Sequence, residues 1–228
     1  MKRSEIDEAV DAALELAAAC SFALPGFAHL SRADWFERRE ALATTLRRGL
    51  GWDVTDFGRG DFARYGLTLC TLRNGSLEER DAGRGQTYAE KLLAVRPGQE
   101  TPFHLHHRKT EDIVHRGGPG VLVLEAHPAD GDRLGTGTVR TLVDGIETDL
   151  AAGEAVRLVA GQSLQVPTGV YHRFWAEDGP VLAGEVSGVN DDVADNRFLE
   201  VSERYPAIEE DVPARHLLVS EHALLLGP

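Results

Sequence analysis

The feature that most constrains the fold of this chain is a series of short apolar runs separated by glycine- and proline-containing turns. The runs occupy residues 66–72, 88–95, 121–125, 139–143, 155–158 and 181–186. Pairs such as Asn74-Gly75 and Pro97-Gly98 separate them. Short strands with such turn signals are typical of an antiparallel sandwich, jelly roll or barrel. We therefore predict a strand-rich region over roughly residues 60–190.

Two amphipathic helices are predicted before this region. Ser4 has the character of an N-cap and is followed by acidic residues, and apolar residues then recur at helical spacing up to about Cys20. A second helix is expected from Ser31, with Asp34 forming a capping box, to Leu50. The pattern predicts a helical N-terminal segment over residues 1–50.

The length and charge of the chain limit its organisation and its partners. A chain of 228 residues fits one domain, residues 1–228, in which a C-terminal segment over residues 191–228 packs on the barrel. The formal net charge of -13 opposes binding to nucleic acid and to anionic membranes. No stretch approaches the roughly 20 apolar residues of a membrane span. We expect no partner of either kind.

The two cysteines and the first residues bear on the cellular compartment. Cys20 and Cys70 lie far apart and form no metal-binding or redox motif, which favours two reduced thiols. Acidic residues follow Lys2-Arg3 directly, so the chain begins without the apolar region of a signal peptide. We expect a cytoplasmic protein.

A first group of metal-ligand residues lies between Gly98 and Gly118. His104 and His106 are separated by one residue, and Glu111 follows after four more. Because side chains alternate along a strand, the two imidazoles project from the same face. Glu111, reached after a loop, can return a carboxylate to the same point.

A second segment supplies a further imidazole. Gly161, Pro167 and Gly169 precede His172, a spacing that places a turn before the histidine. Three imidazoles and one carboxylate suit Mn, Fe, Co, Ni or Zn and leave coordination positions open. Together the two segments resemble the first and second motifs of the cupin superfamily, although Ala176 stands where the second motif often has Asn. The resemblance implies a mainly β cupin jelly-roll barrel with N-terminal α-helices, and a homodimer, because cupins commonly pair.

A wider likeness runs over nearly the whole chain. Short strings at residues 51–55, 57–59, 72–75, 88–91, 106–109, 111–113, 116–118, 174–177, 184–187 and 190–192 resemble the bacterial D-lyxose isomerase family. The resemblance implies an isomerase that interconverts D-lyxose and D-xylulose, and D-mannose and D-fructose, through an enediol. It also implies Mn²⁺ as the cofactor, with Co²⁺ as another possible ion, and a small-molecule sugar as the substrate.

Candidate catalytic and substrate-binding residues follow from this reaction. Lys109 and Lys91 lie close to the first motif and can reach the open side of the ion, where an ammonium group stabilises an oxyanion or binds sugar oxygens. Placement within the family favours Glu203 as the base that moves the proton, with Glu200 as the near alternative.

Two further residues are candidates for the substrate pocket. Asp191 is expected to bind sugar hydroxyls, and Trp175 is expected to form a wall of the pocket. The metal ligands alone leave two alternatives open, an iron-dependent cupin dioxygenase and a non-catalytic sugar-binding cupin.

Overall fold

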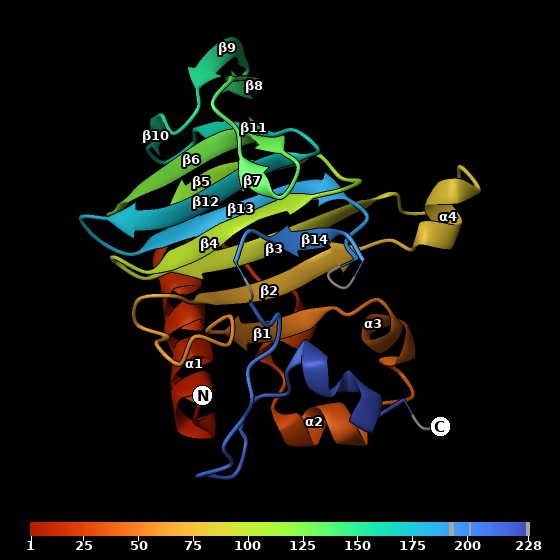
Figure 1. The fold of residues 1–228 in the computed structure, drawn as a ribbon. Helices are drawn as coiled ribbons and strands as arrows, with labels where there is room; N and C mark the ends of the chain where they lie inside the picture. The colour runs from red at the N-terminus through yellow and green to blue at the C-terminus, as the bar shows by residue number, and fades with distance from the viewer. Residues whose placement is uncertain (192–193, 201, 227–228) are drawn as a thin grey trace.

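Two antiparallel sheets curve around a common interior in the computed structural model, which describes residues 1–191, 194–200 and 202–226 (Figure 1). The larger sheet has the order β1 (Gly51–Thr55), β2 (Leu67–Asn74), β3 (Tyr88–Val95), β13 (Val181–Gly188), β5 (Glu111–Gly117), β11 (Ser163–Val166), β8 (Thr138–Val143), β9 (Ile146–Ala151). The smaller sheet has the order β10 (Ala155–Leu158), β6 (Val121–Asp130), β12 (Val170–Glu177), β4 (Glu100–His106), β14 (Asn196–Phe198), and β7 (Arg133–Leu134) pairs with β6. The expected mainly β, cupin-type barrel with N-terminal helices is confirmed.

Each of the six apolar runs read from the sequence forms a strand, namely β2, β3, β6, β8, β10 and β13. Strand β1 begins at Gly51, before the expected start of the barrel at residue 60. Strands β4, β5 and β12 escape a search for apolar runs because histidine and glutamate take several of their inward positions.

The first helix, α1 (Arg3–Ala19), packs its apolar face on the outer face of the larger sheet. The prediction that Ser4 caps this helix is wrong, because Lys2 is the N-cap residue and Ser4 lies in the first turn. Asp211 accepts hydrogen bonds from the Ser4 backbone N at 3.0 Å and from its hydroxyl at 2.6 Å. The acceptor that a cap would supply therefore comes from the C-terminal segment.

Arg3, the residue before Ser4 in the first turn of α1, is fully buried and donates hydrogen bonds to Glu210 and Glu221. These contacts join the first turn of α1 to the C-terminal segment, which runs beside it (Figure 1).

The second expected helix forms as two short pieces. Ser31 and Asp34 make the predicted capping box at the start of α2 (Arg32–Glu37). Turns then separate α2 from α3 (Ala43–Arg47), so the prediction of a single helix from Ser31 to Leu50 is wrong. Residues 38–41 between them are exposed, so this stretch buries no apolar face that would stabilise a continuous helix. Leu42, which follows them, is half-buried and packs on the cluster that contains Trp35 and Leu46. The remaining helices are η1 (Gly26–His29), α4 (Leu77–Asp81) and η2 (Val219–Leu224).

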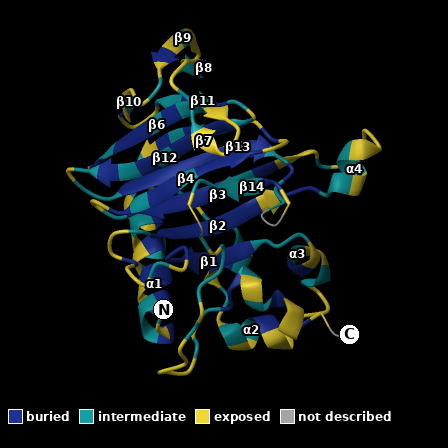
Figure 2. Cartoon of the chain, viewed as in Figure 1, coloured by how far each residue is buried: buried dark blue, intermediate teal, exposed yellow. Residues whose placement is uncertain are grey.

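The larger sheet is buried on both faces near α1. Leu69 and Leu93 point into the barrel, whereas Cys70 and Leu92 point toward the helix. Figure 2 shows this part of the sheet in dark blue, and the β8–β9 hairpin and α4 as more exposed outlying parts. Burial on both faces explains why β2 reads as a nearly continuous apolar run. No helix in the described part of the chain is long and apolar enough to cross a membrane.

Candidate metal centre and active site

Three histidines meet because β4 and β12 are neighbours in the smaller sheet. His104 and His106 alternate with Leu105 along β4, so both imidazoles face the interior. In the antiparallel register His172 lies directly opposite His104, and the centroids of their rings are 4.1 Å apart. The pairing of the strands therefore brings together residues that are far apart in the sequence.

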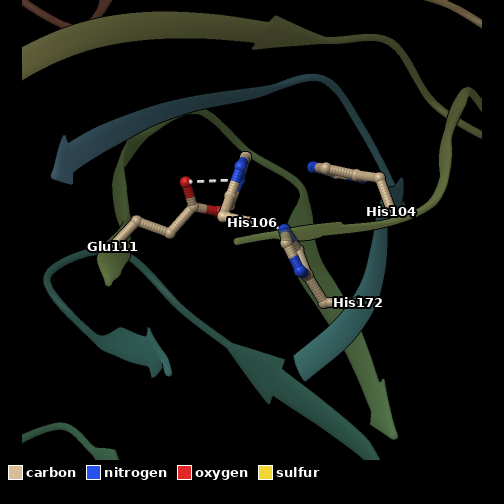
Figure 3. Close-up of side chains that lie close together, drawn as sticks. All are labelled: His104, His106, Glu111 and His172. Carbon is tan, nitrogen blue, oxygen red and sulfur yellow. Dashed lines mark ion pairs between the residues drawn. The ribbon is translucent and has the colours of Figure 1, made fainter. Parts of the chain in front are cut away.

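Glu111 completes the group from the opposite sheet. It is the first residue of β5, and its carboxylate oxygens lie 3.0 Å from His106 Nε2 and 3.0 Å from His172 Nε2. Figure 3 shows the carboxylate and the three rings turned toward one point. One ligand atom from each residue lies within 4.8 Å of all the others, and all four residues are buried. The sequence prediction of these four ligands agrees with the geometry.

The chemistry of the four side chains fits a divalent transition metal. The Nε2 atoms of His106 and His172 are buried and have no hydrogen-bond partner of acceptable geometry among the described residues. Burial, together with the neighbouring imidazoles, holds the pKa of His104 well below its ordinary value, and burial also lowers the pKa of His106. Neutral imidazoles have the lone pairs that a metal requires. A cation is the partner that these nitrogen and oxygen atoms lack.

Glu111 stays ionised in spite of its burial. Desolvation opposes its charge, but Lys109, whose Nζ lies 3.0 Å from the carboxylate, and the nearby imidazoles outweigh desolvation and hold the pKa of Glu111 well below its ordinary value. Lys109 therefore compensates the negative charge of the Glu111 carboxylate.

A second acid, Glu185, lies beside the metal ligands. Its Oε1 accepts a hydrogen bond of 2.5 Å from Lys109, and its Oε2 is 3.4 Å from Lys91 Nζ. Lys91 is the cross-strand partner of Glu185 between β3 and β13. Burial raises the pKa of Glu185, but the two ammonium groups outweigh burial and lower it below the ordinary value. The four charges, in the order Glu111, Lys109, Glu185, Lys91, alternate in sign.

Both predicted lysines thus lie next to the metal ligands. Burial disfavours the ammonium form of Lys109, but Glu111 and Glu185 outweigh it and raise the pKa of Lys109. Lys109 is therefore a permanent cation rather than a base. Lys91 also donates to Asn190 Oδ1 at 2.6 Å.

Several of the metal-ligand and charged side chains line one cavity inside the barrel. His104, Glu111, Lys91 and Glu185 contribute polar atoms, and aliphatic and aromatic side chains cover the rest of the wall. Those apolar residues are Phe57, Leu67, Leu69, Leu93, Ile113, Phe174 and Phe198. Such a site, apolar with a few convergent polar groups, is typical of a pocket for a small molecule.

The structure does not bring four of the predicted residues to this cavity. Glu203 is exposed and lies against Gly58, and Glu200 is exposed and pairs with Arg59 at 2.8 Å. Asp191 accepts a hydrogen bond from the backbone N of Ala194 at 3.0 Å, as an Asx turn does.

Trp175 is the fourth residue away from the cavity. Along β12 the even-numbered His172 and Phe174 face inward, so Trp175 faces outward, where its Nε1 donates to Glu177 at 2.8 Å. Phe174 takes the wall position that was expected for Trp175.

Sequence reasoning missed Glu185 as a site residue, although a signal was present. An ionisable residue between Gly184 and Val186, in the middle of an apolar strand, is costly to bury unless it is paired. Opposite it on β3 lies Lys91, at the start of the apolar run Leu92-Leu93-Ala94-Val95. Two opposite charges in two buried runs indicate a buried ion pair.

Comparisons with known proteins agree with this site. A profile described as D-lyxose isomerase matches residues 1–222. The chain belongs to the D-lyxose isomerase family. A member of this family, the D-lyxose/D-mannose isomerase of Serratia proteamaculans, is 45% identical over 226 residues, which are 97% of this chain and 98% of the relative. The enzyme of the same name from Escherichia coli O157:H7 is 43% identical over the same shares.

Solved structures support the fold. L-ribose isomerase of Cellulomonas parahominis, with no ligand, superposes with a TM-score of 0.56 at 20% identity, over 92% of this chain and 98% of that one. L-ribose isomerase of Geodermatophilus obscurus gives a TM-score of 0.57 at 18% identity over the same shares. At these identities the likeness extends to the barrel and not to the substrate.

Proposed function

We propose that this chain is a metal-dependent aldose-ketose isomerase that interconverts D-lyxose with D-xylulose, and D-mannose with D-fructose. The family and its full-length relatives support this reaction. The observation that carries the proposal is the convergence of four buried ligands, His104, His106, Glu111 and His172, beside a cavity that Glu185 and Lys91 also line. Moving a carbonyl from C1 to C2 needs a base, a cation and a Lewis acid, and this cavity has groups for each.

A divalent ion held by the four ligands supplies Lewis-acid stabilisation of negative charge on the substrate oxygens. We propose Mn²⁺, with Co²⁺ as a second possible ion, since three nitrogens and one oxygen suit both. The apolar wall, which includes Leu69 and Phe174, excludes water and so strengthens the electrostatic contribution of each charged group.

We assign the proton transfer to Glu185 in preference to Glu203. Glu185 lines the cavity, and its lowered pKa keeps it ionised, so that its carboxylate can take the proton from C2 of the aldose and return it to C1. Lys91, which lines the cavity, donates a hydrogen bond to the oxygen that becomes negative in the enediolate, and Lys109, hydrogen-bonded to Glu185 at 2.5 Å, orients the carboxylate. Glu203 would need to move from its position over Gly58 to act.

The two alternatives lose support at this point. An iron-dependent dioxygenase has no use for a buried base between two ammonium groups, and a non-catalytic sugar-binding cupin has no need of one. Family membership favours the isomerase over both.

We further infer a homodimer in the cytoplasm. Cys20 and Cys70 are free thiols, as in proteins of reducing compartments. Tyr88 and Val186, on neighbouring strands of the larger sheet, are exposed apolar side chains that a second copy could cover. Light scattering on the purified protein, with a mass of two chains expected, tests the dimer.

The reaction is tested with protein loaded with Mn²⁺ and incubated with D-lyxose or D-mannose. Chromatography should detect D-xylulose or D-fructose, and His172→Ala should abolish both products. The proposal fails if folded protein loaded with either Mn²⁺ or Co²⁺ forms neither ketose.

A further inference from the structure

In two of the three histidines of the metal centre, the imidazole nitrogen that faces away from the metal lies within hydrogen-bond distance of a main-chain carbonyl oxygen. His104 Nδ1 lies 2.9 Å from the carbonyl oxygen of Pro102, and His172 Nδ1 lies 3.2 Å from that of Val170. Each acceptor belongs to the residue two positions earlier on the same strand. A hydrogen bond to a carbonyl places the proton on Nδ1, so that the lone pair of Nε2 points to the metal.

His106 is the exception among the three. Its Nδ1 is buried and has no hydrogen-bond partner among the residues that the structure describes. No main-chain carbonyl therefore fixes its tautomer or the rotation of its ring. Among the described residues, Asp195 brings a carboxylate near this nitrogen, with its Oδ2 4.0 Å away.

Asp195 is itself buried and lacks a partner. Only 2% of its surface is exposed, and neither carboxylate oxygen has a hydrogen bond to any described residue. Leaving a buried charged group without a hydrogen-bond partner costs more free energy than leaving a neutral one without a partner. The burial of the Asp195 carboxylate is explained if it accepts a hydrogen bond when the metal centre is occupied.

The main chain holds Asp195 beside His106. The carbonyl oxygen of Asp195 accepts a hydrogen bond from His107 N at 3.0 Å, and its N donates to the Asp191 carbonyl at 3.0 Å. The next residue, Asn196, pairs with His106 in the register of β14 and β4. The carboxylate is thus carried by a backbone that is tied to the same strand as the imidazole.

We propose that Asp195 is a positioning residue that accepts a hydrogen bond from His106 Nδ1 and so holds this imidazole for metal binding. A shift of about 1 Å converts the separation of 4.0 Å into a hydrogen bond. Binding of a cation at Nε2 strengthens the Nδ1–H donor, and the carboxylate in turn makes the imidazole a better ligand. This inference rests on the metal centre of the proposed function.

Metal affinity tests the inference without reference to the reaction. The dissociation constants for Mn²⁺ and Co²⁺ are measured by competition with a chelator for wild type, Asp195→Ala and Asp195→Asn. We expect Asp195→Ala to weaken binding by about 10- to 100-fold, and Asp195→Asn by less, because its amide oxygen remains an acceptor. The absorption bands of bound Co²⁺ should shift in both variants.

Glu125→Gln is the matched control. Glu125 pairs with His127 Nε2 at 3.0 Å and with Arg173 at 2.6 Å, so this variant alters another carboxylate–histidine pair, of which neither member belongs to the metal-ligand group. It should bind both ions as wild type does. Thermal unfolding of the metal-free proteins separates a change in folding from a change in affinity.

The outcomes are distinct. Unchanged affinity and unchanged Co²⁺ bands in a folded Asp195→Ala or Asp195→Asn variant overturn the role of Asp195 and leave the metal centre intact. Failure of the wild type to bind either ion overturns the metal centre itself. If Asp195→Ala does not fold, the Asp195→Asn variant decides alone, since it preserves the shape of the side chain.

Discussion

The metal centre and the segment of residues 202–205 border the same cavity but are built in different ways. His104, His106 and His172 lie on paired strands, where the period of two and the register fix which way each side chain points. In the segment, which follows strand β14 and has no regular structure, Arg204 lines the cavity, whereas Glu203, next to it, does not. Positions on strands follow from the sequence pattern, but positions in an irregular segment depend on contacts with distant residues.

The largest effect is expected from a change at a strand position. His172→Ala removes a ligand that is fully buried and lies 3.0 Å from Glu111. Activity with D-lyxose should fall by about 10³-fold or more, because the Lewis acid contributes several kcal/mol. Ketose formation and metal content measured on the same sample check this, and near-normal values for both would break the comparison.

The next effect separates the strand from the segment directly. Glu185→Gln should lower kcat by about 10²- to 10⁴-fold, because the base can no longer accept a proton, and should change KM much less. Glu203→Gln should lower kcat by less than about threefold, because the side chain lies outside the cavity. Steady-state kinetics of the two variants side by side decide between them, and the reverse order would return the proton transfer to Glu203.

A stability effect follows at Lys109. Lys109→Met leaves Glu111 and Glu185 buried with one ammonium group fewer, and breaking such a pair costs about 3–5 kcal/mol. Denaturant unfolding of metal-free protein measures it. A bound ion should recover part of the loss, because it compensates the charge of Glu111. Lys91→Met is the matched variant and should cost less, since Lys91 Nζ lies 3.4 Å from Glu185, whereas Lys109 Nζ lies 2.5 Å from it.

The smallest effect is expected from pH, at the contact between Arg3 and the C-terminal segment. The hydrogen bond from Arg3 lowers the pKa of Glu210 below its ordinary value. A lowered pKa in the folded state gives stability that is present above about pH 4.3, the value of an unfolded glutamate, and is lost as the pH falls further. The side chain of Glu210 is 57% exposed, so screening by water keeps the contribution small.

Melting temperatures of wild type and Glu210→Gln should therefore differ slightly at pH 7 and converge below about pH 4. A difference that stays constant across this range would show that the glutamate acts through packing rather than through charge.

The strands and the four ligands could be predicted because both depend on local patterns. The alternation of side chains, the spacing from His104 to Glu111 and the turn before His172 are all visible in the chain. Organisation as one domain over residues 1–228 stays a prediction. Burial raises the pKa of the Asp112 carboxyl above its ordinary value, a property that no local pattern gives.

What the sequence could not give depended on long-range contacts. Asp211 replaced the expected cap of α1 from across the chain. Asp195, rather than the more conspicuous Asp191, faces His106, because the pairing of β14 with β4 sets its place. Both are acids in turn-forming segments, where composition indicates a loop but does not say which neighbour the side chain meets.

The hydrogen bonds from Arg3 to Glu210 and from Ser4 to Asp211 have a consequence for the order in which parts of the chain can fold during synthesis. During synthesis, the first helix leaves the ribosome before any residue that satisfies its opening turn has been made. Arg3 can therefore exchange its hydration for its carboxylate partners only after Glu210 and Glu221 have been synthesised, so the opening turn of this helix cannot complete its packing earlier.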